Sequence, residues 1–216
     1  MKRRTFALTA AAAALPAALL PAWPARAQGA KSHQDVKPPA DVEAPAGQVE
    51  VIEFFSYACP FCKQFEPAFE AWIKTLPKYV ALRRVHVGWN MDGFMAAPLQ
   101  RIYYALNVLG QVDAMQSKVF AALQTERRHL EQTDVLFPWV ASQGIDRAKF
   151  EQAYNSFGVA TQVQRATVIT NAYQIESTPS LGIAGRFATD PGMAGQGMPG
   201  MIRTASALIE QVHSGK

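Results

Sequence analysis

Cys59 and Cys62 are the only cysteines of this 216-residue chain, and two residues separate them. A structural disulfide, a metal site and a redox centre are the uses that fit this spacing. A disulfide across so short a loop removes little entropy from the unfolded chain, because that contribution grows with loop length. A zinc site needs further ligands, and His86, His129 and His213 are scattered. The spacing therefore favours a redox centre, with no metal and no other cofactor.

The residues around the cysteines predict that Cys59 lies at the start of a helix. The apolar segment 48–57 is rich in β-branched and aromatic residues, which is typical of a buried strand. Pro60 suits a first helical position, where its missing N–H costs nothing. We expect the helix to begin at Cys59 and to reach Leu76, with Cys62 as the shielded partner one turn deeper.

A helix N-terminus favours an anion, because its first N–H groups are unpaired and the macrodipole is positive there. The pKa of Cys59 is therefore expected to fall into the range of about 3.5–7.5. A stable thiolate stabilises the reduced dithiol, so the corresponding disulfide becomes a stronger oxidant.

The rest of the chain predicts an α/β protein with a mixed sheet. Residues 79–89 look like a second strand, and residues 178–189 like a hairpin around Gly185. In residues 97–175 the apolar residues recur with the period of a helix, in five segments separated by turn and cap residues. A final amphipathic helix is expected at 201–212. The order is strand–helix–strand, a helical block, then strand–strand–helix.

The first 27 residues have the features of an export signal. A basic start precedes an alanine-rich apolar run over 6–20, and Ala25-Arg26-Ala27 has the pattern of a cleavage site. A membrane span needs roughly 20 strongly apolar residues, more than this run offers. We expect cleavage after Ala27 rather than a retained anchor. The sequence leaves both general secretory and twin-arginine export open.

Most of the positive charge belongs to this leader. The chain has 21 Lys and Arg against 17 Asp and Glu, and four of the basic residues and none of the acidic ones precede residue 28. Without the leader the two signs balance at 17 each, so charge gives no reason to expect nucleic acid binding. Export also implies an oxidising compartment, in which disulfides persist.

Segment 51–67, VIEFFSYACPFCKQFEP, resembles the active-site strand and helix of the DsbA family of periplasmic thiol:disulfide interchange proteins. The likeness continues through His86-Val87, 155–157 and 196–198. It implies a thioredoxin fold with an inserted all-helical subdomain. The expected division is a cleaved signal peptide at 1–27, the thioredoxin fold at 28–96 and 176–216, and the insertion at 97–175.

The resemblance implies that the Cys59–Cys62 disulfide is donated to reduced proteins in the periplasm. A quinone-linked membrane oxidase of the DsbB type would reoxidise the pair, and we expect a monomer. A disulfide reductase or isomerase and a non-catalytic peptide-binding module are the alternatives. Isomerases of this superfamily usually carry an N-terminal dimerisation domain, for which residues 28–47 are too short. Glutathione transferases of the kappa type also insert helices into a thioredoxin fold. They usually lack the export leader and the second active-site cysteine, so the sequence disfavours this class.

The resemblance also implies a cis peptide bond before Pro179. Thr178 would then offer its backbone to an extended substrate segment, with Pro60 and Phe61 also in the substrate-binding set. Phe61 departs from the family, whose best-known members have histidine there. Phenylalanine gives the thiolate neither a hydrogen bond nor a positive charge, so the oxidising strength stays open.

Glu53 interrupts the apolar strand six residues before Cys59. If both faces of the sheet are covered, burial raises its pKa and it can accept a proton when Cys62 reacts. The alternative is a carboxylate that faces solvent. Glu66 matches a second acid of the family, and Arg84 stands where the family carries lysine, which titrates more readily than arginine.

Overall fold

The computed structural model describes residues 31–88 and 93–215, with the backbone alone for 93–96. The expected signal peptide, residues 1–27 with cleavage after Ala27, lies outside the described residues. Within the described part of the chain, no helix is both long enough and apolar enough to cross a membrane.

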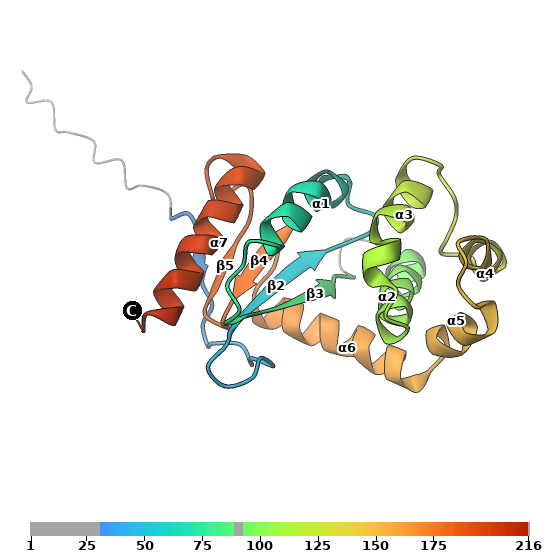
Figure 1. Ribbon diagram of the computed structural model, residues 1–216, viewed down its shortest axis with the longest axis horizontal. Coiled ribbons are helices and arrows are strands. Elements are labelled where there is room, and N and C mark those ends of the chain that lie inside the picture. The colour runs from blue at the N-terminus through green and yellow to red at the C-terminus, as the bar shows by residue number, and fades with distance from the viewer. Residues whose placement is uncertain (1–30, 89–92, 216) are drawn as a thin grey trace, which may run out of the picture.

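A five-stranded mixed sheet forms the centre of the molecule, in the order β1-β5-β4-β2-β3 (Figure 1). The central strand β2 pairs in parallel with β3 and antiparallel with β4. Strand β5 pairs antiparallel with both β4 and β1. The strands are β1 Gln34–Asp35, β2 Val49–Phe55, β3 Val80–His86, β4 Ser180–Ile183 and β5 Phe187–Thr189.

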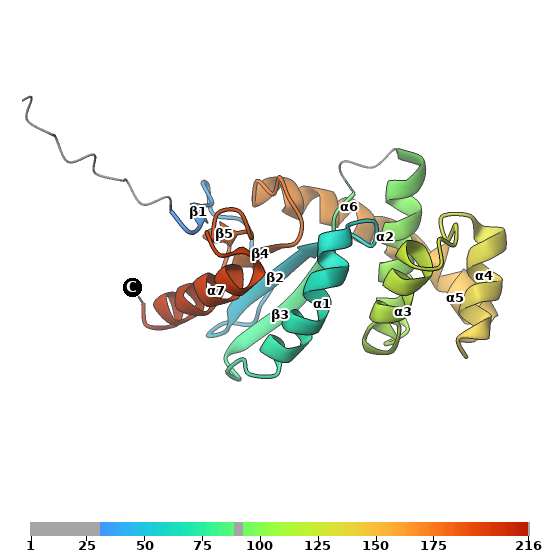
Figure 2. The ribbon, with the colours of Figure 1, turned by 90° about the horizontal axis from the view of Figure 1, so that it is seen from above.

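Two helices cover one face of the sheet, α1 Pro60–Ile73 and α7 Gly197–His213 (Figure 2). Alternate residues of β2 point to this face, so Val49 and Val51 pack into one apolar cluster with Phe65 of α1 and Leu208 of α7. These side chains are almost fully buried. The α1 helix is therefore fixed against the strand that leads into it.

Among the described residues, five further helices lie between β3 and β4 in the chain: α2 Gly93–Val108, α3 Val112–Gln124, α4 Thr133–Ser142, α5 Arg147–Tyr154 and α6 Phe157–Ala172. The long helix α6 returns from this helical block along the side of the sheet opposite α1 and α7 (Figures 1 and 2). Just after α6, Tyr173 packs on Phe54 of β2, with ring centroids 5.2 Å apart. This is a thioredoxin fold with a helical insertion, as predicted.

Several elements differ from the sequence-based expectation; among them, α1 ends at Ile73 rather than Leu76, and α2 begins at Gly93 rather than at residue 97. Helix α1 begins at Pro60, because Cys59 has an extended backbone (φ −84°, ψ 116°) and is the N-cap. Helix α7 begins at Gly197, four residues before the expected start. The lead-in segment contains the short strand β1, which pairs with β5 through Gln34 and Ala188.

Candidate active site

Cys59 is the N-cap residue of α1, and Pro60 occupies the first turn. The Cys59 sulfur accepts a hydrogen bond from the backbone N–H of Cys62 at 3.4 Å. The first N–H groups of a helix have no partner within the helix, so an acceptor that carries negative charge is stabilised there. The strand–turn–helix order thus places the first sulfur where a thiolate is favoured.

The loop before β4 lies against Cys59. In its protonated form, Cys59 donates a hydrogen bond to the carbonyl oxygen of Thr178, 3.3 Å away. The peptide bond between Thr178 and Pro179 is cis, as the resemblance implied, and Pro179 is buried. The Ser177 hydroxyl donates to a carboxylate oxygen of Asp190 at 2.8 Å. This loop is therefore held both to the sheet and to the segment that follows β5.

The two cysteines are free thiols in contrasting environments. A hydrogen bond from the Cys62 side chain is the main cause that lowers the pKa of Cys59 to about 6. Hydrogen bonds from the Thr178 side chain and from the backbone of Cys62 and Phe61 act in the same direction, while burial opposes them. Cys62 is fully buried, and burial raises its pKa far above the ordinary value of 9.0. At neutral pH the pair therefore consists of one thiolate and one thiol.

The low pKa of Cys59 agrees with the sequence-based expectation, but its main cause differs. The helix terminus contributes through the backbone N–H groups, whereas the largest contribution comes from the second cysteine itself. Cys62 can act in this way because a residue three positions along the first turn lies on the same side of the helix.

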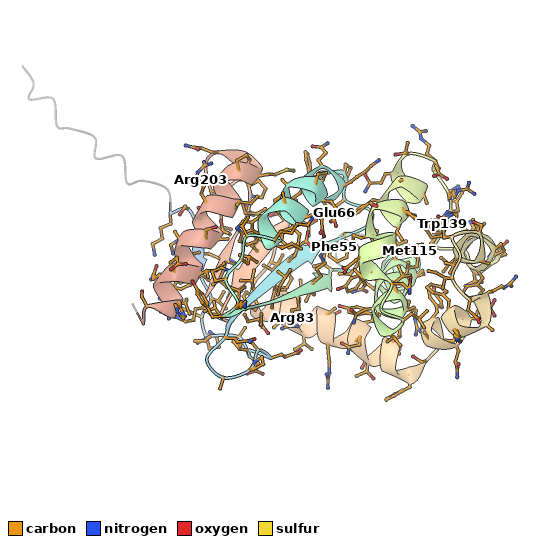
Figure 3. The ribbon with its side chains drawn as sticks, in the orientation of Figure 1. Phe55, Glu66, Arg83, Met115, Trp139 and Arg203 are labelled. Carbon is orange, nitrogen blue, oxygen red and sulfur yellow. The ribbon has the colours of Figure 1, made fainter. Side chains whose placement is uncertain are left out.

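Arg84 of β3 stands at the centre of three carboxylates beneath α1. Its Nε lies 2.9 Å from Oε2 of Glu53, and its Nη2 lies 3.1 Å from Oε1 of Glu66. The same Nη2 is 2.5 Å from Oε1 of Glu70. Glu53 is fully buried, so the alternative of a solvent-facing carboxylate is wrong. Glu66 projects from the side of α1 that faces the sheet, one turn beyond Cys62 (Figure 3).

Burial governs the charge of this cluster. It raises the pKa of Glu53 to about 8, against the opposing effect of the Arg84 charge. Burial also raises the pKa of Glu66, again against Arg84. Burial opposes the charge of Arg84, but the three carboxylates outweigh it and raise the pKa of Arg84 further, so the guanidinium stays protonated. One cation faces three acids, so the cluster holds a carboxyl proton that can exchange near neutral pH.

Two residues that the sequence did not assign to the site, Gln124 and His86, hold the turn before Cys59. Gln124, the last residue of α3, donates to the carbonyl oxygens of Tyr57 at 2.8 Å and of Cys59 at 3.0 Å. His86 accepts the backbone N–H of Tyr57 at 3.0 Å through Nε2. Burial lowers the pKa of His86 to about 3, so the ring is neutral. Gln124 lies far from Cys59 in sequence and no local pattern marks it, whereas His86 belongs to the His86-Val87 segment of the family resemblance, which could have pointed to it.

The two residues between the cysteines face outward. Pro60 is exposed, and the Phe61 residue is 60% exposed. An apolar ring this open beside the Cys59 sulfur is available for contact with another molecule. In the described ranges, no group of three or more His, Cys, Asp or Glu residues is arranged to hold a metal ion.

The fold and the paired sulfurs define a class of protein. A thioredoxin fold that carries a thiolate and a buried thiol at the start of its first long helix is the framework of thiol:disulfide oxidoreductases. The sequence profile of the Thioredoxin family matches residues 43–195.

Comparisons with individual proteins narrow this class. A thiol:disulfide interchange protein DsbA of Bordetella parapertussis is 42% identical over 211 residues, covering 98% of this chain and 99% of the relative. The DsbA of Burkholderia cepacia is 35% identical and covers 94% of this chain and 93% of the relative. The crystal structure of Pseudomonas aeruginosa DsbA superposes with a TM-score of 0.79 at 30% identity, over 86% of this chain and 94% of that one. The chain belongs to the DsbA family of thiol:disulfide interchange proteins.

Proposed function

We propose that Cys59 and Cys62 form the redox centre through which this family member oxidises dithiols in exported proteins. In the first step a substrate thiolate attacks the Cys59 sulfur of the Cys59–Cys62 disulfide. The bond between the two cysteines breaks, its electron pair passes to the Cys62 sulfur, and that sulfur takes up a proton. The substrate thiolate and Cys59 are then joined in a mixed disulfide.

The second step completes the transfer. A second substrate thiolate attacks the substrate sulfur of the mixed disulfide, and Cys59 leaves as a thiolate. The substrate gains a disulfide and loses two electrons, which the protein keeps as its dithiol. The single observation that carries the proposal is the difference in pKa between the two sulfurs, which is low for Cys59 and high for Cys62. Because the pKa of Cys59 is about 6, its thiolate is a good leaving group in this step.

Cys62 needs a proton partner, since its own pKa is far above neutrality. The Glu53 carboxyl, with a pKa of about 8, is the candidate that donates or accepts this proton. A general acid or base works best when its pKa is close to the working pH. Arg84 stays charged throughout, so the exchangeable proton belongs to the carboxyl groups of the cluster.

The reduced substrate would bind as an extended segment across the Cys59 turn. Thr178 lies in contact with Cys59 and would offer its backbone to that segment, with Pro179 fixing the loop. Pro60 and the exposed ring of Phe61 would supply apolar contact beside the mixed disulfide.

The location and the redox partner follow from the same proposal. Cleavage after Ala27 would release the chain into the periplasm as a monomer. The reduced dithiol must be reoxidised, and a quinone-linked membrane oxidase of the DsbB type is the partner that the family implies. Reduced exported proteins are the other partners.

The deciding experiment is the redox equilibrium of the purified protein with glutathione. A potential near about −120 mV, the general value for DsbA, identifies an oxidant, whereas one near about −270 mV identifies a reductant of the thioredoxin type. A Cys59→Ser variant tests the catalytic role separately. Disulfide formation in cells that survives this substitution would identify a peptide-binding module instead.

A further inference from the structure

A cavity of about 250 Å³ opens directly beside the active-site turn. Ala58, the residue before Cys59, lines it together with Leu99 of α2 and Leu123 of α3. Arg127, Arg128, His129 and Glu131, from the loop after α3, also line the cavity. Apolar and charged groups therefore meet next to Cys59.

The cavity is fixed in position relative to Cys59. Gln124, which also lines it, donates hydrogen bonds to the carbonyl oxygens of Tyr57 and Cys59 at 2.8 and 3.0 Å. Ala58 is exposed, and its small side chain leaves the approach from Cys59 open. A polypeptide joined to Cys59 would thus bring its neighbouring side chains within reach of this cavity.

Arg127 has an unusual backbone for its type. Its φ is +54°, in the left-handed region, and it lies where the chain turns out of α3. The N–H of Arg128 closes that turn on the carbonyl oxygen of Ala122 at 2.9 Å. Glycine is the usual residue at such a position, because a Cβ atom there is strained. The sequence places an arginine there despite that strain, on the wall of a cavity.

The charge of Arg127 is also uncompensated. Arg128 pairs with Glu126 at 2.6 Å, and His129 lies 2.9 Å from Glu131. Arg127 forms no ion pair with any residue in the described part of the chain. Strain and a free charge at one residue, beside the reactive sulfur, together suggest a role in binding.

The size and the walls of the cavity indicate what it would hold. Small-molecule sites usually measure about 300–1,000 Å³, so a cavity of about 250 Å³ suits a side chain better than a whole ligand. Ala58, Leu99 and Leu123 match the methylene groups of such a side chain, and Arg127 matches a terminal carboxylate. The one acid of the lining, Glu131, is engaged by His129 at 2.9 Å, so Arg127 is left to meet an incoming acid.

We propose that this cavity is a substrate subsite that binds a glutamate side chain close to the reacting cysteine of the reduced polypeptide. The inference rests on the proposed function and deepens it by naming a substrate preference. The subsite selects among reduced substrates by charge, because a lysine side chain in the same place would be repelled by Arg127.

The test uses synthetic dithiol peptides that are identical except for Glu, Gln or Lys beside the first cysteine. The oxidised wild-type protein is expected to react with the Glu peptide about threefold to fivefold faster, as kcat/KM, than with the Gln peptide, since partly exposed charge pairs contribute on this scale. The Lys peptide should be slowest. The preference should shrink in high salt, which screens exposed charges.

Two Arg127 variants separate binding from folding. Arg127→Gln and Arg127→Gly should both lose the preference, so that the Glu and Gln peptides react with equal kcat/KM in each variant. Arg127→Gly should also raise the denaturation midpoint, because glycine relieves the backbone strain. The matched control is Gln174→Gly, also at φ +54° after a helix, which should gain stability and keep the preference.

The outcomes are distinct. Equal kcat/KM for all three peptides with the wild-type protein, or a preference that survives both Arg127 variants, would overturn the subsite and leave the proposed function standing. If the wild-type protein oxidises none of the peptides, the proposed function fails and the subsite with it.

Discussion

The Cys59 sulfur lies 3.3 Å from the carbonyl oxygen of Thr178, although 119 residues separate the two in sequence. The helical block from α2 to α6 lies between them in the chain, so the two parts of the thioredoxin fold meet at this contact. The environment of the nucleophile is therefore set jointly by the start of α1 and by the loop before β4. Changes in either part should be measurable at the sulfur.

The first prediction concerns the titration of Cys59. The thiolate absorbance of the reduced protein near 240 nm should titrate with a midpoint close to pH 6, since the pKa of Cys59 is lowered to about 6. Cys59→Ser should abolish this step. A midpoint close to 9.0, the ordinary value for a cysteine, would contradict the described hydrogen bonding.

The same shift predicts how stability depends on pH. A depressed pKa stabilises the folded reduced protein fully above the ordinary pKa of 9.0, and this contribution is lost as the pH falls through about 6. The free energy of unfolding of the reduced form should therefore rise relative to the oxidised form from pH 6 to pH 9. Urea denaturation of both forms measures the difference. Glu53 is present in both forms, so its own titration cancels to first order.

The second prediction concerns Arg84. Arg84→Met should lower the free energy of unfolding by about 3–5 kcal/mol at pH 8, because it leaves Glu53 and Glu66 buried without a cation. The loss should shrink as the pH falls toward 4.5, the ordinary pKa of a glutamate, because protonation of the two buried carboxyls removes the uncompensated charge. Arg147→Met is the control, because the Arg147–Glu151 pair is exposed and such pairs contribute less than about 1 kcal/mol. An equal loss at pH 5 and pH 8 would argue against an electrostatic cause.

The parts of the fold that depend on local signals could be predicted from the sequence. The apolar run before Cys59 gave β2, and the turn at Gly185, with φ +68°, gave the β4–β5 hairpin. Strand β1 has no such signal, since its two residues are placed by tertiary contacts: the pairing with β5 and the hydrogen bonds of the Gln34 side chain to the carbonyl oxygens of Tyr173 and Gln174. The first turn of α7 contains glycines and a proline, which form helices poorly, so local propensity places the start of the helix too late. Tertiary packing accounts for this turn. Gly200 is buried there, where a Cβ would lie 3.0 Å from the carbonyl oxygen of Ala194.

The candidate site likewise contains residues that could be predicted from the sequence and residues that could not. Cys59 and Cys62 are evident from their spacing, and the buried acid Glu53 from its place in an apolar strand. Gln124 and Asp190 reach the active site only through the tertiary fold. Both are polar residues without an unusual sequence context, so no one-dimensional pattern separates them from surface residues.

The third prediction concerns Phe61, which offers the Cys59 thiolate neither a hydrogen bond from its side chain nor a charge. Phe61→His should make the disulfide more oxidising, because an imidazole can stabilise the thiolate of the reduced form. The readout is the equilibrium with glutathione at pH 7. Phe61→Leu serves as the control, since it keeps an apolar side chain and should leave the equilibrium close to that of the wild type. An unchanged equilibrium in Phe61→His would reject the prediction.

The last prediction concerns Asp190, which anchors the loop that carries Thr178. One of its carboxylate oxygens accepts the Ser177 hydroxyl at 2.8 Å, and the other accepts the backbone N–H of Met193 at 2.7 Å. Asp190 does not touch the reacting sulfur, so it is a positioning residue. In Asp190→Ala the Ser177–Thr178 segment loses this anchor, and the hydrogen bond from the Thr178 side chain to Cys59 weakens.

The expected results in Asp190→Ala are a higher pKa of Cys59 and a slower reaction with dithiol peptides at pH 6.5. A general loss of stability alone would not move the titration midpoint, and Asp146→Ala provides that comparison. Asp146 caps α5 by accepting the N–H of Lys149, so its removal should cost about 0.5–2 kcal/mol and leave the pKa of Cys59 unchanged. Equal midpoints in the two variants would show that the Thr178 loop keeps its position without Asp190. A shift confined to Asp190→Ala would place the control of the thiolate partly in a residue 131 positions away from it in sequence.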